Sequence, residues 1–509
     1  MTGIYSNIVE AKDGTLIPVF KSNQTMYSKY YPAKDADFFL KNCKEDEKQF
    51  FLICGIGNGL HIKALRNKFP KAKILAFESY QEDLNFLETN FNINQMSKEY
   101  LFDICLQEDI PKNIINKYVP IIHGNFSMLQ QRAWADNNKE NLEKITLSVN
   151  QVLEEISADI STQGYFGKIW HRNIIQNLLL APEINQNPDV LNTKKTEALI
   201  VAAGPSLDLA IEKIQSDTYI KNQFIISTDT ALPVLYKNNI QPDMVVTIDG
   251  QIISRLHFIG KLSKETCIAA DLSCCPTIIR QAINQKYPII FTRSNHPLAS
   301  IISKYFYDEY KYEITNIYSG SGTVTIAAVD IAINMGFKKI NVTGADFAYI
   351  NGQAYAKGTY FDEIIFPKTS KINTYEQEYH STFFNKKLIK NSNGTQTTYN
   401  LKAYHKSFEE HIKKYSFIKE NNPDNSGIQS YTTNLNVDKK LKYFIPNKNQ
   451  CTEFIEWYLK MLQEKNQNIF PSVLPLATWY KRNNNETDIF SSLKLAYYLT
   501  VRYNSMHGK

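Results

Sequence analysis

Six short segments of the chain combine residue types that bind or react with a phosphorylated ligand. Each of them follows a run of apolar residues that has the length of a buried strand. Ligands of open α/β sheets bind beyond the carboxyl ends of parallel strands, so these side chains would meet at one edge of a sheet. The segments are Gly204 to Asp208, Ser227 to Asp229, Asp249-Gly250, Thr292 to His296, Ser319 to Thr323 and Gly344 to Asp346.

The segment AAGPSLD has the composition of a phosphate or nucleotide cradle. Gly204 ends a predicted strand and lets a ligand approach the backbone closely. Pro205 and Ser206 open a predicted helix, because proline suits the first helical turn. The free amides at that helix start favour a phosphate. The alternative is a tight turn in which Ser206 only caps the helix.

The run SGSGTV offers a second site of the same kind. Small residues and hydroxyl groups stand directly before a long apolar helix, and they are Ser319, Gly320, Ser321, Gly322 and Thr323. Such a helix start attracts anions. A flexible loop that ends in a simple helix cap is the alternative.

The elements around these segments alternate between strand and helix. Between residues 195 and 365, the runs EALIVAAG, FIISTDT, MVVTIDG, CIAADLS, YPIIFTRS and KINVTGADF have the pattern of strands. Helical patterns such as GTVTIAAVDIAINMGF separate several of them. Apolar strands that alternate with helices predict a mostly parallel sheet covered on both sides. The fold class is therefore α/β, with a central Rossmann-like sheet.

The pattern of elements predicts four parts. Residues 1–125 form a smaller Rossmann-like α/β domain, and residues 126–194 form a bridge of amphipathic helices that Pro182 ends. Residues 195–400 form the central domain, whose polar stretch 366–400 is a long loop or lid. Residues 401–509 show helical periodicity and form a helical C-terminal region.

A glycine-rich turn in the N-terminal part has the fingerprint of a dinucleotide or S-adenosylmethionine site. Gly55, Gly57 and Gly59 follow a predicted strand, and Glu78 ends the next strand at the spacing of a ribose contact. Alone, this pattern suggests a methyltransferase. The rest of the methyltransferase pattern is weak, so we expect a Rossmann-like unit to which no cofactor is assigned.

Composition excludes several classes of protein. The 509 residues are 43% apolar and 21% charged, with a formal net charge of +6, which is too small over this length to indicate nucleic-acid binding. No apolar stretch approaches the length of a membrane span, and the first residues lack the apolar core of a secretory signal. The seven scattered cysteines suit reduced thiols. We expect a cytoplasmic protein.

Three segments together resemble a known family. AAGPSLD, STDTALPVLYKNNIQPDMVVTIDG and SGSGTVTIAAVDIAINMGFKKINVTGADFAY are similar to the central domain of the motility-associated factor (Maf) flagellin glycosyltransferases. They resemble more distantly the bacterial lipooligosaccharide sialyltransferases, which also have a G-P-S-L turn, a serine-glycine stretch before a helix and a G-x-D-F strand end. The resemblance covers residues 195–380, and residues 50–80 and HRNIIQNLLLAP also fit the Maf layout.

The sialyltransferase resemblance implies how the donor would bind. Gly204, Pro205 and Ser206 would contact the phosphate and ribose of CMP, and Thr228 and Asp229 would lie near the nucleotide. The loop from Ser319 to Thr323 would hold the cytidine or the carboxylate of the sugar. The donor-binding set that we expect also contains three strand-end or turn carboxylates, Asp208, Asp249 and Asp346.

The same resemblance implies candidates for the chemical step. Tyr349 and Tyr355 flank an N-G turn after G-x-D-F, although one inserted residue leaves their register uncertain, and their hydroxyl groups would bond the departing phosphate. His380 follows at the distance of the lid histidine and would take the proton of the acceptor hydroxyl. His296, or one of Asp249 and Asp346, is a rival base.

The resulting hypothesis is a CMP-nonulosonate:protein O-glycosyltransferase. A nonulosonic acid, such as pseudaminic, legionaminic or a sialic-like acid, would pass from CMP to a serine or threonine of flagellin. No cofactor is required, and the participation of a divalent metal stays open.

Two rival hypotheses remain. Archaeal hydroxymethylpterin diphosphokinases, the MptE-like proteins, share the G-P-S-L turn and the G-x-D strand end. In such an enzyme Mg²⁺ and ATP would bind, with Asp229, Asp249 and Asp346 as metal ligands. The length of this chain argues against it, because those proteins resemble the central domain without its flanks. The other rival is a flagellin-binding assembly factor without turnover.

Overall fold

The computed structural model describes residues 3–43, 49–320, 322–391, 394–421, 426–436, 438–484 and 489–507. The chain forms two compact units. The N-terminal unit comprises Met1–Tyr165 and Tyr480–Ile489, and the central unit comprises Phe166–Trp479 and Phe490–Lys509. This division differs from the expected four parts, because the helical segments contribute residues to both units instead of forming domains of their own.

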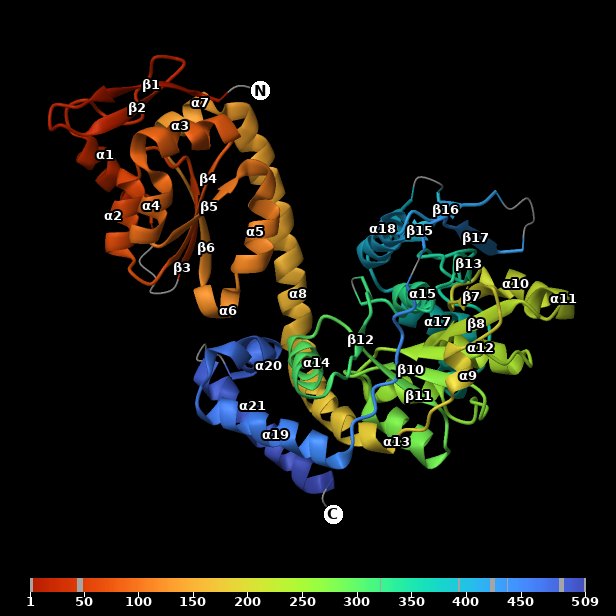
Figure 1. The fold of residues 1–509 in the computed structure, drawn as a ribbon. Coiled ribbons are helices and arrows are strands. Elements are labelled where there is room, and N and C mark those ends of the chain that lie inside the picture. Colours follow the sequence, from red (N-terminus) through yellow and green to blue (C-terminus); the bar gives the residue numbers. More distant parts are fainter. Residues whose placement is uncertain are drawn as a thin grey trace. The chain divides into compact units, whose positions relative to one another are not determined.

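The N-terminal unit is built on a four-stranded parallel sheet (Figure 1). Its strand order is β5 (Phe102–Leu106), β4 (Lys73–Glu78), β3 (Gln49–Cys54) and β6 (Asn125–Gln130). Every residue of β3 is buried. Because β6 pairs with β3 along its whole length, the sheet extends beyond the predicted boundary at residue 125.

A hairpin and short helices complete the N-terminal unit. The hairpin is β1 (Tyr5–Glu10) and β2 (Leu16–Phe20). The helices are α1 (Pro32–Phe39), α2 (Leu60–Lys68), α3 (Gln81–Phe91), α4 (Ile93–Glu99), α5 (Ile110–Lys117), α6 (Pro120–His123) and α7 (Arg132–Asn137). The expected bridge of two helices is one helix, α8 (Lys139–Leu180), which ends two residues before Pro182.

The central unit contains a nine-stranded sheet, which confirms the predicted α/β class with a mostly parallel sheet. Seven strands are parallel: β12 (Thr315–Asn316), β11 (Ile289–Arg293), β10 (Cys267–Asp271), β9 (Met244–Thr247), β8 (Gln223–Thr228), β7 (Glu197–Val201) and β13 (Lys339–Thr343). β17 (Ile428–Thr432) and β16 (Ile418–Lys419) add two antiparallel strands beyond β13. Residues 401–509 are therefore not wholly helical, because this segment completes the edge of the sheet.

The order of the strands reverses between β7 and β13. From β7 the chain proceeds strand by strand to β12, and it then crosses back to place β13 on the other side of β7. Ligands of open α/β sheets bind at such a reversal, beyond the carboxyl ends of the strands. The G-P-S-L turn follows β7 and the G-x-D segment follows β13, so both lie at the reversal.

Helices cover both faces of the central sheet (Figure 1). Alternate residues of β7 point to opposite faces, Ala198 and Ile200 toward α15 (Val324–Asn334), Leu199 and Val201 toward α10 (Leu207–Ile214). The other helices are α9 (Pro188–Leu191), α11 (Asp217–Ile220), α12 (Leu232–Lys237), α13 (Pro276–Asn284), α14 (Pro297–Tyr310), α16 (Tyr360–Ile365), α17 (Tyr375–Phe383), α18 (Tyr399–Lys414), α19 (Lys448–Gln463), α20 (Phe470–Asn484) and α21 (Ile489–His507).

The predicted lid, residues 366–400, is partly regular structure. It contains α17 and the short pair β14 (Ile389–Lys390) and β15 (Gln396–Thr397). A capping box begins α17, in which the side chains of Thr374 and Gln377 each bond the backbone of the other residue. The polar composition of this segment indicated a loop, whereas its capping residues define the helix α17.

The remaining sequence predictions concern thiols and membrane spans. All seven cysteines are free, and six of them are buried. Within the described ranges, no helix has the length and apolar character that a bilayer span requires.

Candidate functional site

The glycine-rich turn of the N-terminal unit is filled by side chains of the same chain. A Cβ atom on Gly55 would lie 2.5 Å from Cδ1 of Trp134, and one on Gly57 would lie 2.1 Å from Sδ of Met26. Glu78 is fully buried and accepts hydrogen bonds from the Tyr5 hydroxyl (2.9 Å) and Trp134 Nε1 (2.7 Å). Burial raises the pKa of Glu78 to about 7. The Glu78 carboxylate, which was expected to contact a ribose, thus forms hydrogen bonds with other residues of the same unit.

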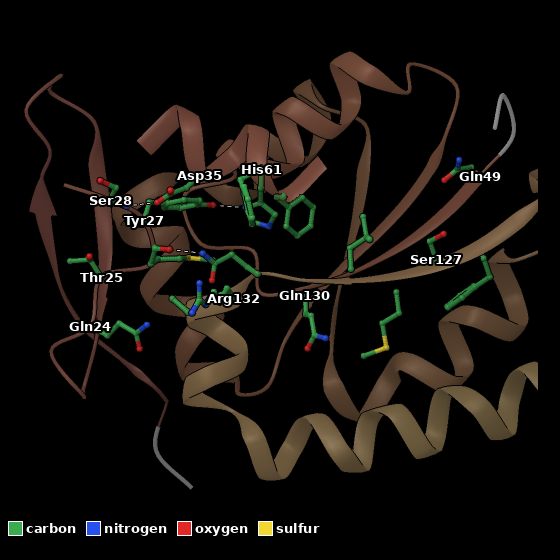
Figure 2. A pocket seen from close by; sticks show the side chains of 18 of the residues that line it. Gln24, Thr25, Tyr27, Ser28, Asp35, Gln49, His61, Ser127, Gln130 and Arg132 are labelled. Atoms are coloured by element: carbon green, nitrogen blue, oxygen red, sulfur yellow. Dashed lines mark hydrogen bonds between the residues drawn. The ribbon is translucent and has the colours of Figure 1, made fainter. Parts of the chain in front are cut away.

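A cavity of about 1120 Å³ lies beside β6 in the same unit (Figure 2). The segment 24–28, helix α1 and residues 125–133 line it. At one end the Tyr27 hydroxyl bonds Nδ1 of His61, whose Nε2 lies 2.9 Å from the carbonyl oxygen of Gly55. The lining contains one acidic and one basic residue, Asp35 and Arg132, and it therefore lacks the cluster of cations that a phosphate requires.

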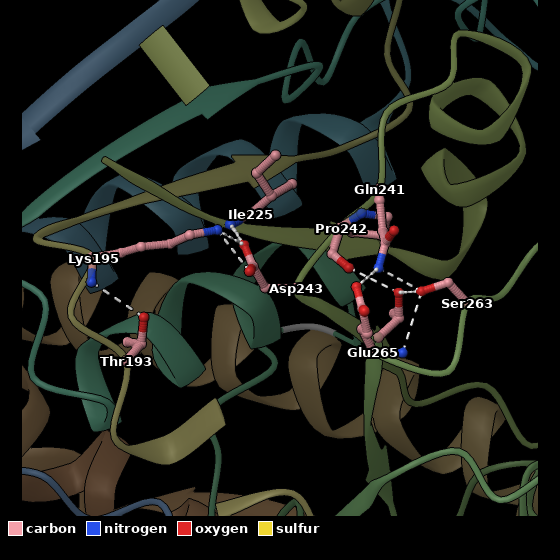
Figure 3. A network of polar contacts seen from close by, with 9 residues as sticks. Thr193, Lys195, Ile225, Gln241, Pro242, Asp243, Ser263 and Glu265 are labelled. Atoms are coloured by element: carbon pink, nitrogen blue, oxygen red, sulfur yellow. Dashed lines mark hydrogen bonds and ion pairs between the residues drawn. The ribbon is translucent and has the colours of Figure 1, made fainter. Parts of the chain in front are cut away.

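The amino edge of the central sheet carries a polar network that is structural (Figure 3). Nζ of Lys195 lies 2.7 Å from both carboxylate oxygens of Asp243, and the Ile225 amide donates to Oδ2 at 2.7 Å. These residues join the starts of β7, β8 and β9. The candidate site is at the opposite, carboxyl edge.

At the carboxyl edge, the backbones after β7 and β13 approach each other closely. The Gly204 amide donates to the carbonyl oxygen of Gly344 at 2.7 Å, and the Ala202 amide donates to that of Thr343 at 2.9 Å. A Cβ atom on Gly344 would lie 2.0 Å from the Ala202 oxygen. The glycines are therefore required by the contact between the two strand ends.

Asp346 occupies the turn that was predicted to hold a phosphate. The Ser206 amide donates to Oδ2 of Asp346 at 2.9 Å, and the Gly344 amide donates to the Ser206 hydroxyl at 3.1 Å. The next amide, that of Leu207, bonds the Gly204 carbonyl at 3.0 Å. The expectation of free amides is wrong for this state, because α10 begins at Leu207 and the turn satisfies its own donors. Ser206 also makes no side-chain cap of α10.

The chain passes back over this turn after β13. The Ala356 amide donates to the carbonyl oxygen of Ala203 at 2.9 Å, and the Lys357 amide donates to Oδ1 of Asp208 at 3.1 Å. Burial raises the pKa of Asp208. In this structure Asp208 therefore fixes the covering segment, and donor binding by Asp208 stays a prediction.

The residues after β8 also form hydrogen bonds within the protein. Asp229 is 2% exposed, and it accepts hydrogen bonds from the Thr247 hydroxyl (2.9 Å) and the Thr230 amide (2.7 Å). Burial raises its pKa to about 6. The Thr228 hydroxyl accepts the Ala231 amide at 3.3 Å as a cap of the next turn. Both predicted residues thus lie at the carboxyl edge, one strand away from the reversal, and both are buried.

Asp249 lies beside two residues that the sequence pattern did not identify. Oδ1 of Asp249 accepts the Gln251 amide at 2.9 Å, and burial, assisted by Asp229, raises the Asp249 pKa. His257 ends a short 3₁₀ helix, and its ring packs edge-on against Tyr360, with 4.2 Å between the ring centroids. Neither residue follows a strand directly, so the rule for strand ends could not reveal them.

The serine-glycine loop forms a tight turn before α15. The amides of Gly322 and Thr323 donate to the carbonyl oxygen of Ser319 at 3.0 and 2.9 Å. The Thr323 hydroxyl caps the helix by accepting the Thr325 amide at 3.3 Å. Gly320 and Gly322 have φ values of +57° and +93°. Ser321 lies outside the described residues, and ligand binding by this loop stays a prediction.

The predicted lid residues meet at one aromatic side chain. The Tyr349 hydroxyl donates to the carbonyl oxygen of Phe383 at 3.2 Å, and its ring lies 4.8 Å from that of Phe384. His380, which is exposed on α17, stacks on Phe384 at 5.1 Å. The structure thus brings Tyr349 and His380 to the same neighbour.

Tyr355 belongs to an adjoining aromatic cluster. Its ring stacks on Phe361 at 4.8 Å and contacts Phe383 edge-on at 5.4 Å. Burial raises the pKa of its hydroxyl group. The residue is therefore packed into the covering segment, and its catalytic role stays a prediction.

His296 performs a structural task. Its Nδ1 accepts the Leu298 amide at 3.2 Å and so caps α14. Burial lowers its pKa to about 3. A neutral ring is required for this cap, because a protonated Nδ1 cannot accept a hydrogen bond.

Two asparagines of α8 hold the loops that border the site. Nδ2 of Asn173 donates to the carbonyl oxygens of Gly250 (2.9 Å) and Ser273 (3.0 Å). One helical turn later, Nδ2 of Asn177 donates to those of Leu272 and Cys274, both at 2.9 Å. The signal for them was the spacing of four residues in HRNIIQN, which places both on one helix face.

The carboxylates do not form a metal cluster in this state. In the part of the chain that the structure describes, no three His, Cys, Asp or Glu side chains are grouped so that they could hold a metal ion. Asp229, Asp249 and Asp346 each accept hydrogen bonds from neighbouring residues instead.

Comparison with known proteins relates the central unit to several others. Residues 172–352 match the family model described as 6-hydroxymethylpterin diphosphokinase MptE-like. An uncharacterised protein of Treponema pallidum (strain Nichols) is 36% identical over 181 residues, which cover 33% of this chain and 84% of that protein. A second one from the same bacterium is 25% identical over 251 residues, covering 48% and 79%.

A solved structure matches over nearly the whole chain. It is a Maf glycosyltransferase from Magnetospirillum magneticum AMB-1, with a TM-score of 0.54 and 14% sequence identity. The match covers 98% of this chain and 86% of that chain. The two proteins share a fold, as the resemblance of the sequence motifs predicted.

Proposed function

This chain belongs to the same family as the Treponema pallidum protein to which it is 36% identical, and we propose that it is a glycosyltransferase that transfers a nonulosonic acid from CMP to a serine or threonine of flagellin. The fold that it shares with a Maf glycosyltransferase supports this proposal. So does the position of the G-P-S-L and G-x-D segments at the reversal of strand order.

The observation that carries the proposal is the cluster of Gly204, Ser206, Gly344 and Asp346. Its outward chemistry is that of a carboxylate and a hydroxyl, which suit the ribose hydroxyls and the amino group of a cytidine nucleotide. The donor would lie over this cluster and the loop from Ser319 to Thr323. Asp249 would line the same edge.

The transfer would be a single displacement at the anomeric carbon. The segment that crosses over the cluster would exclude water, which would otherwise hydrolyse the donor. Tyr349 and Tyr355 would bond the departing phosphate, with His380 as one candidate for the base. Such a reaction needs no resident cofactor, and it suits a cytoplasmic protein that meets nucleotide sugars and unassembled flagellin.

A second candidate is a Mg²⁺-dependent diphosphokinase, because residues 172–352 match the MptE-like family model. Asp346 follows β13 at the reversal, and Asp229 and Asp249 follow β8 and β9 at the same carboxyl edge. Carboxylates are suitable ligands for Mg²⁺. A flagellin-binding assembly factor without turnover is the third candidate.

Calorimetric titration distinguishes the candidates. The protein is titrated with CMP and with ATP, each with and without Mg²⁺. The glycosyltransferase predicts CMP binding without metal, with at least a tenfold loss of affinity for Ser206→Ala. Ser97→Ala, which removes an equivalent hydroxyl on α4 of the N-terminal unit, is the matched control. Binding of ATP only in the presence of Mg²⁺, with no binding of CMP, would favour the diphosphokinase. Binding of flagellin in the absence of any nucleotide would favour the assembly factor.

A further inference from the structure

His257 is a buried histidine whose Nδ1 forms no hydrogen bond within the fold that the structure describes. His257 is 6% exposed. Nδ1 is buried without a hydrogen-bond partner among the described residues. Nearly all buried polar atoms of native proteins are paired, so an unpaired imidazole at a candidate site points to a functional use.

Charged and titratable groups surround His257. Asp249 favours the protonated ring, whereas Lys261 opposes it. Nζ of Lys261 in turn pairs with Oε1 of Glu363 at 3.1 Å, which offsets its charge. Tyr360 packs against the ring edge, and burial, with smaller contributions from Asp249 and Asp229, raises the Tyr360 pKa. The histidine thus belongs to the same group as the carboxylates that follow β8 and β9.

The environment keeps the ring neutral at ordinary pH. Burial lowers the pKa of His257 to about 4, and Asp249 partly counteracts this effect. A neutral imidazole has a lone pair that can accept a proton, and a neighbouring carboxylate stabilises the imidazolium that forms. The pair therefore has the composition of a general base and its supporting acid group.

We infer that His257 is the base of the transfer reaction and that the charge of Asp249 favours its protonated form. This inference rests on the proposed glycosyltransferase function. The proton of the acceptor hydroxyl passes to the unpaired imidazole nitrogen as the hydroxyl oxygen bonds the anomeric carbon. The bond between that carbon and the phosphate oxygen breaks, and its electron pair leaves with CMP. The imidazolium then releases its proton to water.

The rival histidines are less suited to this role. His296 already uses Nδ1 to cap α14. His380 is exposed on α17 and stacked on Phe384, so its ring is not held in a buried, water-free position. Because Tyr360 begins α16 and covers His257, the acceptor would reach the ring when α16 moves aside.

The test compares His257→Gln with His380→Gln in the full chain. CMP release is followed from CMP-activated N-acetylneuraminic, pseudaminic and legionaminic acids, with and without flagellin as acceptor. For His257→Gln we expect transfer to fall at least about 100-fold, the usual loss for a general base. The Kd for CMP should stay within about twofold, and His380→Gln should lose less transfer than His257→Gln. His123→Gln, which changes a histidine of the N-terminal unit, is the control and should transfer within about threefold of the wild type.

Two further measurements separate a base from a structural histidine. Imidazole added to His257→Gly should restore part of the transfer, which a misfolded variant cannot do. In Asp249→Asn the acidic limb of the kcat/KM profile should move to lower pH, because the carboxylate that raises the His257 pKa is gone. Thermal melting reports whether each variant is folded.

The outcomes are distinct. Normal transfer by a folded His257→Gln, or loss of transfer in His380→Gln alone, would overturn the assignment while the proposed function stands. Failure of the wild type to bind CMP or to release it from any of the three donors would remove the proposed function, and the inference with it.

Discussion

The backbone amide of Ser206 donates a hydrogen bond to Oδ2 of Asp346 at 2.9 Å, although 140 positions separate the two residues in the chain. The bond joins the segments that follow β7 and β13, the strands between which the strand order reverses. It places a carboxylate where an anion of a ligand was expected. The site is therefore acidic at its centre, and it suits hydroxyl and amino groups of a donor better than a bare phosphate.

Removing the Asp346 carboxylate should destabilise the central unit. Asp346→Ala leaves the Ser206 amide without its acceptor, and we expect the free energy of unfolding to fall by about 1.5–3 kcal/mol, the usual contribution of a hydrogen bond to a charged group. Asp346→Asn retains an acceptor oxygen and should lose less than half as much. Urea denaturation measures both, and equal losses would contradict a role for this bond.

Gly204→Ala should prevent the close approach of the two strand ends. The added Cβ would lie 2.3 Å from Oδ2 of Asp346 and 2.5 Å from the Gly344 carbonyl oxygen, so backbone has to move. We expect a loss above about 2 kcal/mol, as for overpacking in a rigid core, together with loss of CMP binding.

The control for that change is Gly352→Ala. Gly352 has a φ of +75° and open space around the position of a Cβ atom. The cost there should be only the strain of a left-handed alanine, about 1–2 kcal/mol. If the two variants are equally stable in thermal unfolding, the steric argument fails.

The stability of the central unit should carry a pH signature from Asp229. Burial raises its pKa to about 6, whereas an exposed aspartate in the unfolded chain titrates near its ordinary value of 3.8. Between these values the folded protein retains a proton that the unfolded chain has released. The contribution of Asp229 to stability therefore falls as pH rises from about 4 to 6, by about 3 kcal/mol, and is constant above that.

The measurement is the difference in unfolding free energy between the wild type and Asp229→Asn at several pH values. The difference is needed because buried histidines act in the opposite sense. Burial lowers the pKa values of His257 and His296 to about 4 and about 3, so their contributions rise with pH up to the pKa of an exposed histidine. A difference that does not change with pH would refute the burial effect at Asp229.

The N-terminal unit should not bind a dinucleotide or S-adenosylmethionine. Met26 and Trp134 fill the space at the glycine turn, and Glu78 is bonded to Tyr5 and Trp134. Calorimetry with NAD and with S-adenosylmethionine should therefore give no binding heat. Trp134→Ala should cost about 3–5 kcal/mol, as expected for truncation of a buried tryptophan. Binding that Trp134→Ala leaves unchanged would mean that a ligand occupies a different part of this unit.

The class of the fold followed from local patterns in the sequence. Strands buried on both faces, such as EALIV and FIIST, read as continuous apolar runs, and their alternation with helices requires a parallel sheet. The rule that polar residues after such strands meet at one edge predicted a set that includes Gly204 and Asp346, which the structure brings into contact. The strand β17 was missed because polar residues interrupt IQSYT and because it pairs antiparallel with β13, far along the chain.

The roles of individual residues were decided by tertiary structure. The sequence determined which side chains stand at strand ends, since that depends on neighbours along the chain. It did not determine that Asp346 would accept a hydrogen bond from the Ser206 amide or that Met26 and Trp134 would fill the glycine turn. It also did not determine that His257 would be buried against Tyr360. Each of these contacts joins elements that only the packed sheet brings together, and the burial that sets the pKa values arises from the same packing.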